Sequence, residues 1–193
     1  QARAVAAAVE EHAWDGEWYR RAWYDDGTII GSARCEEAAI DSISQSWAII
    51  SGAADPDRAR QALDSAWKHL VLPEEKMALL LAPPFGDGKK DPGYIKGYPP
   101  GVRENGGQYT HAAMWLAKAL AMSGDGEKAV DLLTWLNPVR HTMDADGVLR
   151  YMTEPYAVAA DVYRLEGHVG QGGWTWYTGA AGWMYRVWIE DIL

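Results

Sequence analysis

A glycine- and proline-rich segment carries a carboxylate and an imidazole to the start of an apolar helical pattern. Residues 97–111 contain four glycines, two prolines, Glu104 and His111, and residues 112–120 continue with apolar positions at helical spacing. Glycine and proline at this density give a loop a fixed, folded-back shape. The first N–H groups of a helix are unpaired, so a protonated His111 beside them would bind phosphate or sulfate. The alternative for a lone histidine near a helix start is a packing role.

A second segment, residues 170–186, combines small residues with tryptophan and tyrosine. The Thr178 hydroxyl and the Gly179 N–H offer unobstructed donors, and the next three residues are also small. Such donors can cradle an oxyanion. Alternatively, the small residues let two helices pack closely while the aromatic residues fill the core. Considered together with His111, the segment favours an anion cradle.

The number of carboxyl groups required differs between two kinds of glycosyl transfer. Transfer to water with inversion needs one carboxyl group as acid and a second as base. A phosphate nucleophile needs no base, so one acid and an anion cradle suffice. The candidates for a carboxylate pair are Glu17, Glu104 and Glu154. Glu154 precedes a proline, where it can contact a sugar hydroxyl or begin a helix.

Metal and covalent chemistry have little support in the sequence. The five histidines are scattered without ligand spacing, and Cys35 is the only cysteine. We therefore expect no metal and no nucleophilic cysteine. A single cysteine fits a reducing compartment, so we expect a cytoplasmic location. A parent protein anchored to the inner membrane by other segments is compatible with this expectation.

The composition limits the possible partners. The chain has 193 residues and a net charge of −9, which argues against nucleic acid and anionic membranes. It has no apolar run of membrane-spanning length, so we expect no direct membrane contact. Eleven tryptophans and ten tyrosines accompany one phenylalanine. Their flat faces and polar tips suit sugar-binding clefts, although core packing is the commoner use of an aromatic residue.

Helical patterns separated by loops account for most of the chain. Helix start, stop and spacing patterns predict helices near residues 2–12, 41–50, 56–70, 108–122, 127–136, 157–163 and 172–193. Residues 14–30 predict a small β-hairpin, and residues 83–107 a long functional loop. Helical hairpins with long loops gathered on one side are typical of an α/α toroid. We expect a single all-α domain over residues 1–193.

Four ordered motifs resemble glycoside hydrolase family 94, which contains inverting phosphorylases of β-glycosides and the C-terminal domain of cyclic β-1,2-glucan synthase. They are residues 97–111, the Glu-Pro-Tyr at 154–156, the Trp-Tyr-Thr-Gly at 176–179 and the Trp-Met-Tyr at 183–185. The Trp-Asp-Gly-Glu-Trp at 14–18 is most similar to the glucan-synthase branch. The resemblance covers essentially the whole chain. It implies the C-terminal part of an (α/α)6 toroid, an incomplete domain that begins inside a helix.

The resemblance also implies roles for particular residues. His111, Thr178 and Gly179 correspond to the phosphate-binding residues of the family, with inorganic phosphate as co-substrate and no cofactor. Glu104, Tyr109 and Glu154 correspond to sugar contacts. The general acid of the family is an Asp in an upstream Trp-Asn-Asp segment that does not occur here, and a phosphate-binding arginine also lies upstream. Ala160 replaces a glutamine of the disaccharide phosphorylases, which fits a different linkage.

The expected function is therefore a phosphorylase or glycosyltransferase part that acts on β-glucans. Phosphorolysis with inversion would give α-glucose 1-phosphate. The partners would be a β-glucan oligosaccharide, phosphate and the remainder of the same polypeptide, and the isolated chain would be inactive because it lacks the acid. Two alternatives stay open. One is a carbohydrate-binding module without chemistry, and the other is an inverting hydrolase on the same toroid.

Overall fold

The computed structural model describes residues 1–176 and 178–193, with the backbone alone at Thr178. Eight α-helices occur in this part of the chain: α1 Ala2–His12, α2 Ser42–Ile50, α3 Pro56–Leu70, α4 Thr110–Met122, α5 Gly126–Trp135, α6 Pro138–His141, α7 Ala145–Tyr151 and α8 Thr178–Arg186. A 3-10 turn, η1, covers Tyr94–Gly97, and a π-helical segment, η2, continues α8 over Val187–Ile192. The expected all-α class is confirmed.

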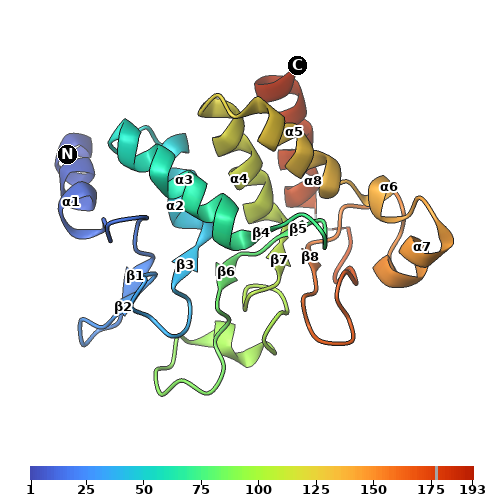
Figure 1. The fold of residues 1–193 in the computed structure, drawn as a ribbon, viewed down its shortest axis with the longest axis horizontal. Coiled ribbons are helices and arrows are strands. Elements are labelled where there is room, and N and C mark those ends of the chain that lie inside the picture. The colour runs from blue at the N-terminus through green and yellow to red at the C-terminus, as the bar shows by residue number, and fades with distance from the viewer. Residues whose placement is uncertain (177) are drawn as a thin grey trace.

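Helix α4 is the centre of the packing. It contacts α2, α5 and α8, and it lies between them in Figure 1. Its buried residues lie on more than one face of the helix, among them the fully buried Met114, Leu116 and Leu120. Several alanines along α4 let the neighbouring helices approach closely, and the main hydrophobic core forms around them.

Short polar side chains determine where the helices begin. Asp41 accepts a hydrogen bond from the Ile43 N–H and caps α2. Asp55 accepts from the N–H groups of Asp57 and Arg58 and caps α3, whose first residue is a proline. Each cap satisfies N–H groups that have no partner within the helix. The predicted starts of α2 and α3 are confirmed.

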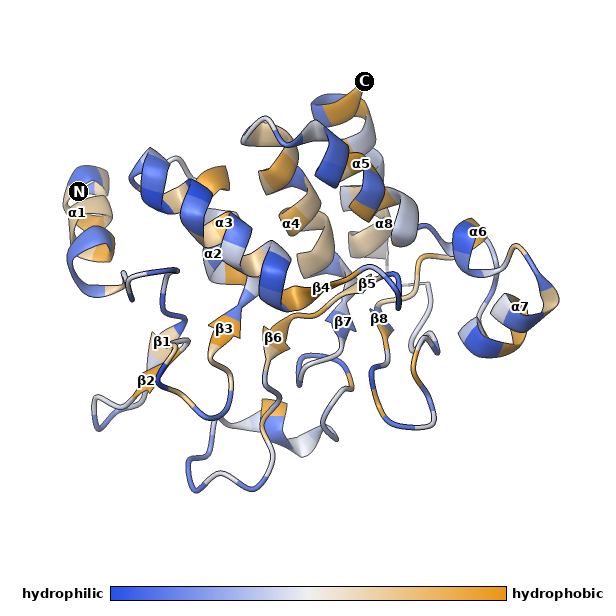
Figure 2. Ribbon diagram, viewed as in Figure 1, coloured by the Kyte–Doolittle hydropathy of each residue, from blue (hydrophilic) through white to orange (hydrophobic). Residues whose placement is uncertain are grey.

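The described residues form four two-stranded antiparallel ladders, which lie below the helix bundle in Figure 1. The pairs are β1 Ala22–Trp23 with β2 Ile29–Ile30, β3 Ile40–Asp41 with β6 Leu81–Ala82, β4 Val71–Leu72 with β5 Met77–Ala78, and β7 Gln108–Tyr109 with β8 Asp161–Val162. The first pair is the hairpin expected near residues 14–30. Figure 2 shows that hydrophilic residues are common in the loops of this end, while hydrophobic residues concentrate in the helices and strands.

Three predicted helices differ from the structure in extent or type. Residues 157–163 form β8 and its flanking turns, because β8 pairs with β7 and Ala160 accepts from the Thr110 N–H. The last helix begins at Thr178, not near residue 172, because the Gly172 N–H donates to the Tyr151 carbonyl at 2.8 Å. Helix α4 begins at Thr110, since residues 108 and 109 belong to β7.

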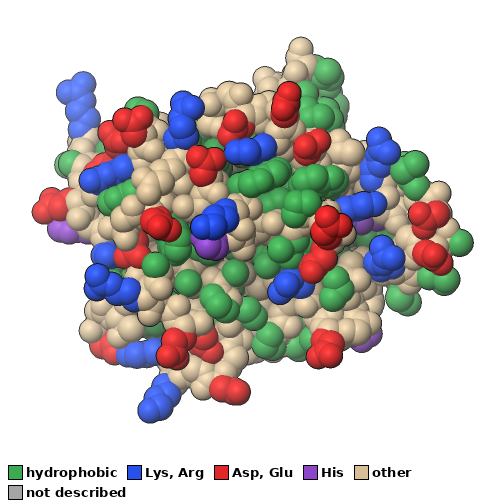
Figure 3. All heavy atoms as spheres, viewed as in Figure 1, with side chains coloured by type: hydrophobic (Ala, Val, Ile, Leu, Met, Phe, Trp, Pro, Cys, Tyr) green, Lys and Arg blue, Asp and Glu red, His purple; other side chains and the backbone are tan. Residues whose placement is uncertain are grey.

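The tryptophans divide between core and surface. Trp18 is buried, and five partly buried tryptophans pack against the core: Trp14, Trp67, Trp135, Trp183 and Trp188. Four others are exposed: Trp23, Trp47, Trp174 and Trp176. In the space-filling view, apolar side chains also form a patch on one face among scattered charges (Figure 3). The core interpretation therefore holds for about half of these residues.

Candidate functional site

A cavity of about 690 Å³ opens where the long loop, the short strands and the start of α4 meet. Its lining includes three predicted site residues, Glu104, Tyr109 and His111, together with Arg21 and Asp41. They come from segments separated by up to ninety positions in the sequence. The fold thus brings a carboxylate, a phenol and an imidazole to one space, as the sequence predicts.

His111 lies against the start of α8. It is the second residue of α4, and a Cβ added at Gly179, the second residue of α8, would lie 3.2 Å from its Nδ1 and Cε1 atoms. Two helix N-termini therefore meet at this imidazole, and the partial positive charge of both favours an anion there. The predicted proximity of His111 and Gly179 agrees with this geometry. The side chain of Thr178 lies outside the described part of the structure.

The environment of His111 is aromatic and partly closed. Its ring centroid lies 4.7 Å from that of Trp115 and 6.1 Å from that of Trp183, and Trp115 in turn contacts Trp47. Burial lowers the pKa of His111, so the empty site holds a neutral imidazole at neutral pH. An arriving phosphate would favour the protonated form again, because an opposite charge raises the pKa of a histidine. The packing and anion-binding interpretations of His111 are therefore compatible.

Glu104 is held by its neighbour Arg103. The Glu104 Oε2 atom lies 3.5 Å from the Arg103 Nε atom, and both atoms are buried without a hydrogen-bond partner in the described chain. The Arg103 guanidinium lies 5.5 Å from the Tyr98 ring centroid and 5.4 Å from that of Trp174. A planar cation between two aromatic rings has a fixed orientation. The pair thus holds two polar atoms without a hydrogen-bond partner beside the cavity that Glu104 lines.

Asp161 is a further acidic group beside this pair. It is fully buried, its Oδ1 atom accepts from the Trp174 N–H at 3.3 Å, and its Oδ2 atom has no hydrogen bond in the described chain. Burial raises the pKa of Asp161, while the charge of Arg103 opposes this rise. The sequence interpretation missed both residues. Arg103 stood in the loop without an assigned role, and Asp161 fell in the wrongly predicted helix at 157–163.

Tyr109 connects the loop to these acids. Its strand partner in the β7–β8 ladder is Asp161, and its side chain is half-buried. Burial raises the pKa of Tyr109, and the charge of Glu104 adds to the rise. The phenol therefore stays protonated and can donate a hydrogen bond to a ligand.

Asp41 and Arg21 form the opposite wall of the cavity. The Asp41 Oδ2 atom lies 3.4 Å from the Arg21 Nε atom. Burial raises the pKa of Asp41, although Arg21 lowers it. The Asp41 Oδ1 atom caps α2, so both carboxylate oxygens of Asp41 have a structural partner. Asp15 is likewise engaged, by Arg20 and the Ala33 N–H.

Glu154 and Glu17 do not line this cavity. The Glu154 Oε1 atom accepts from the Trp176 Nε1–H at 2.9 Å, and Tyr156 contacts the same indole edge-on at 6.1 Å. Of the three candidates for an inverting carboxylate pair, only Glu104 lies in the lining. The role of Glu154 in sugar contact stays a prediction.

Comparison with known proteins identifies the family. The model of the glycosyl hydrolase 94 superfamily catalytic domain matches residues 1–193. The chain belongs to this superfamily. It is 50% identical over 190 residues to the cyclic beta-(1,2)-glucan synthase NdvB of Rhizobium meliloti (strain 1021), which covers 98% of this chain and 7% of that protein. The family resemblance stated from the motifs is thereby confirmed, and so is the helical toroid-type fold.

Phosphorylases are also among the proteins to which this chain is similar. The chain is 33% identical over 192 residues to the solabiose phosphorylase of Paenibacillus borealis, covering 98% of this chain and 24% of that protein. It is 32% identical over 195 residues to an N,N'-diacetylchitobiose phosphorylase of Vibrio furnissii, covering 100% of this chain and 24% of that protein. The chain therefore spans about a quarter or less of the length of these relatives.

The described residues contain neither a metal-binding cluster nor a membrane-spanning helix. No group of three or more His, Cys, Asp or Glu residues there has the arrangement of a metal site. No helix in the same residues is long and apolar enough to cross a membrane.

Proposed function

We propose that this chain supplies the phosphate-binding wall and part of the sugar-binding wall of an inverting β-glycoside phosphorylase centre. The observation that carries the proposal is the convergence of two helix N-termini on His111, where a Cβ added at Gly179 would lie 3.2 Å from the imidazole. The first N–H groups of an α-helix have no partner within the helix, and phosphate matches such donors in charge and geometry. The names of the relatives, a cyclic β-glucan synthase and several phosphorylases, support the same chemistry.

In this proposal, His111, the Gly179 backbone and Thr178 orient phosphate for attack on the anomeric carbon of a β-glucoside. The new carbon–oxygen bond forms on the face opposite the bond that breaks, so the product is an α-glucose 1-phosphate. Glu104, Tyr109 and Glu154 bind sugar hydroxyls. A proton from a general acid elsewhere in the polypeptide goes to the leaving oxygen. Positioning and electrostatic stabilisation are then the contributions of this chain.

The substrate in this proposal is a β-linked glucan, and the remainder of the same polypeptide completes a single α/α toroid. The relative with the highest identity given above is a cyclic β-(1,2)-glucan synthase, which supports a β-1,2-glucan. We place the reaction in the cytoplasm, because a single cysteine is compatible with a reducing compartment and phosphate is a soluble co-substrate.

The test measures glucan cleavage by the complete natural polypeptide with and without inorganic phosphate. We expect phosphate-dependent release of α-glucose 1-phosphate, and we expect His111→Ala to lower kcat/KM for phosphate by about 10²–10³-fold. His12→Ala, an exposed histidine on α1, is the matched control and should leave the rate unchanged. Equal cleavage without phosphate would exclude the proposal.

A carbohydrate-binding module is the second candidate function. The exposed rings of Tyr156, Trp174 and Trp176 favour it, since exposed aromatic faces stack on sugars. Glucan titration of the complete polypeptide separates the two functions. Glucan binding without any phosphate-dependent turnover, unchanged by His111→Ala, would support the module and contradict the phosphorylase.

A further inference from the structure

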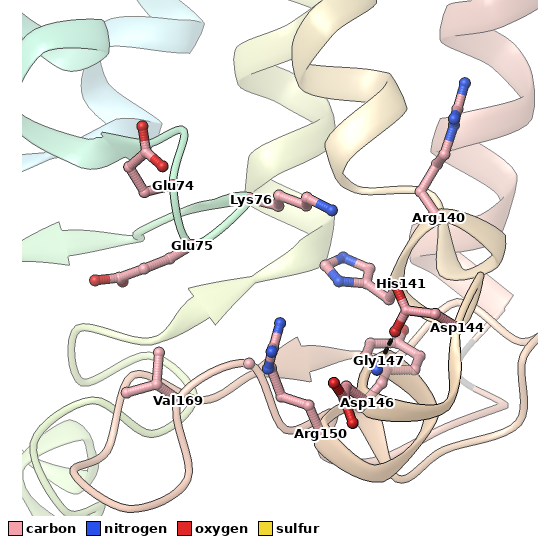
Figure 4. Close-up of a pocket in the computed structure, with 12 residues that line it drawn as sticks. Glu74, Glu75, Lys76, Arg140, His141, Asp144, Asp146, Gly147, Arg150 and Val169 are labelled. Carbon is pink, nitrogen blue, oxygen red and sulfur yellow. Dashed lines mark hydrogen bonds between the residues drawn. The ribbon is translucent and has the colours of Figure 1, made fainter.

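A second cavity, of about 500 Å³, lies away from the first, between the β4–β5 turn and helices α6 and α7 (Figure 4). The two cavities share no lining residue. Lys76 comes from the turn, His141 ends α6, and Arg150 and Tyr151 close α7. The proposed phosphorylase reaction uses none of these residues, so this cluster needs its own explanation.

His141 is fixed as a neutral hydrogen-bond acceptor. Its ring stacks on Tyr151 with the centroids 4.8 Å apart and the planes 3° apart. The Trp135 backbone carbonyl accepts from the ring, while the Nε2 atom is buried and has no partner in the described chain. An imidazole that donates through Nδ1 carries a lone pair on Nε2. Burial, Lys76 and Arg150 lower the pKa of His141 to about 4.

Two cations face this imidazole. In Figure 4, the ends of Lys76 and Arg150 point toward His141. Neither forms an ion pair within the described residues. Uncompensated cations that lower the pKa of a neighbouring histidine form a local positive potential, which attracts an anion.

Four carboxylates also line the cavity, but the charges that act on His141 are those of Lys76 and Arg150. Glu75 forms an ion pair with Arg164 at 3.2 Å and points away from the imidazole in Figure 4. The Asp144 Oδ1 atom accepts from the Gly147 N–H at 2.7 Å and caps α7. Glu74 and Asp146 do not point at the imidazole in the same view.

The backbone of Lys76 gives independent support. Its φ is +53°, in the left-handed region, at the end of a tight turn closed by a hydrogen bond to the Pro73 carbonyl. Glycine or asparagine is the favoured residue in this conformation, which costs a lysine roughly 1 kcal/mol. A charged residue held in such a conformation, with its end beside the imidazole in Figure 4, is compatible with a functional constraint.

We propose that this cavity binds a small hydroxylated anion of the sugar monophosphate class. Lys76 and Arg150 hold the phosphate group, and the Nε2 atom of His141 accepts a hydrogen bond from a sugar hydroxyl. The volume of the cavity is in the range that accommodates a ligand of this size. The site lies apart from the proposed phosphorylase centre and does not depend on it.

The first test is chemical protection of the unmodified complete polypeptide. Acetylation of Lys76 is followed by mass spectrometry with glucose 6-phosphate, glucose 1-phosphate, inorganic phosphate or glucose present. Lys89 is an exposed control. We expect either sugar phosphate to slow acetylation at Lys76 about tenfold, with no effect at Lys89 and none from glucose. Equal rates at Lys76 with and without the sugar phosphates would overturn the proposal. Protection as strong from inorganic phosphate alone would also overturn the sugar monophosphate class.

The second test uses calorimetry in a His111→Ala background, which separates the two anion sites. Lys76→Gly removes the charge and suits the left-handed backbone, so loss of the fold does not complicate the result. We expect Lys76→Gly and Arg150→Met each to weaken glucose 6-phosphate binding about tenfold. Arg140→Met is the control, because Arg140 lines the same cavity but contacts the Met143 sulfur. Changes below about twofold in the first two variants would contradict the proposal.

Discussion

At His111, burial and helix geometry act in opposite directions. Burial lowers the pKa of the imidazole, whereas the two helix N-termini at the same point favour a negative ligand. Without an anion the His111 imidazole is therefore neutral, and it gains its charge when an anion binds. Gly179 contributes to this arrangement because a residue without a Cβ lets the ring lie here without a tight contact.

Gly179→Ala should weaken phosphate binding without unfolding the protein. The added methyl group would lie 3.2 Å from the imidazole, so the ring must shift by a few tenths of an ångström. We expect about a tenfold rise in the phosphate Kd, since bound geometry tolerates little displacement. Titration of the complete polypeptide with phosphate measures this.

Gly182→Ala is the matched control, because a Cβ there meets nothing within 4 Å and the residue lies on the same helix. It should leave phosphate affinity unchanged and raise the free energy of unfolding by up to about 1 kcal/mol. A similar loss of affinity in both variants would contradict the role assigned to Gly179.

The sequence predicted His111, Glu104 and Gly179 as site residues because each stands in a local motif. It did not predict Arg103 and Asp161 as neighbours. Their proximity depends on the β7–β8 ladder, which joins segments more than fifty residues apart through two paired positions. No local pattern encodes such a contact. A two-residue strand is too short for the alternation by which strands are recognised.

At the scale of elements, the long loop at residues 83–107 owes its shape to buried side chains. The Asn105 Oδ1 atom accepts from the Phe85 N–H at 2.7 Å, and its Nδ2 atom donates to the Phe85 and Tyr98 carbonyls. Glu37 accepts from the N–H groups of Gly86 and Gly88. The loop was predicted to be folded and functional from its length and composition. The hydrogen bonds of Asn105 and Glu37 that hold the loop could not be predicted, since each comes from a single polar residue without a spacing pattern.

Asn105→Asp should loosen this loop. The substitution keeps the Oδ1 acceptor but replaces the Nδ2 donor with an oxygen that faces two carbonyls. We expect a loss of about 2–4 kcal/mol in local stability. Hydrogen exchange of the amides at residues 94–107, followed by mass spectrometry, should therefore become faster by a factor of about 10 or more.

Asn137→Asp is the control for this change. Asn137 uses only its side-chain oxygen, which accepts from the Val139 N–H at 3.0 Å and caps α6. An aspartate keeps that cap, so exchange at residues 94–107 should match the unaltered protein. Unchanged hydrogen exchange in Asn105→Asp would show that the side-chain hydrogen bonds of Asn105 do not hold the loop.

At the scale of the whole molecule, α2–α5 and α8 form a bundle, while α6 and α7 lie beside the ladders and loops (Figure 1). The helices were largely predictable because their apolar residues recur with the helical period and their caps are standard residues. Helices α6 and α7 were missed because they are short, and α7 contains a glycine. Both form one wall of the second cavity, so that cavity was not visible in the sequence either.

The buried neutral His141 should make the whole protein sensitive to acid. Its pKa is about 4 in the folded state, against 6.5 for the free side chain. Between these values, the unfolded chain takes up a proton that the folded chain does not, so stability falls as the pH drops from about 6.5 to about 4. The loss from this residue is roughly 3 kcal/mol. Urea unfolding at several pH values measures it.

His141→Phe keeps the ring stacked on Tyr151 and removes the titrating group. It should show a shallower fall of stability over the same pH range, and the carboxylates common to both proteins cancel in the comparison. Identical pH dependence in the two proteins would show that His141 titrates at its ordinary value.

The contacts of Trp115 with Trp47, Trp183 and His111 have an optical consequence. Three indoles at centroid separations of 5.4 and 6.0 Å exchange excitation energy, and an imidazole quenches indole emission more strongly once it is protonated. A charge that appears on His111 is therefore reported as a change in fluorescence. The aromatic residues around the anion site act as an intrinsic fluorescent probe, so occupancy of the site can be followed in real time without a label.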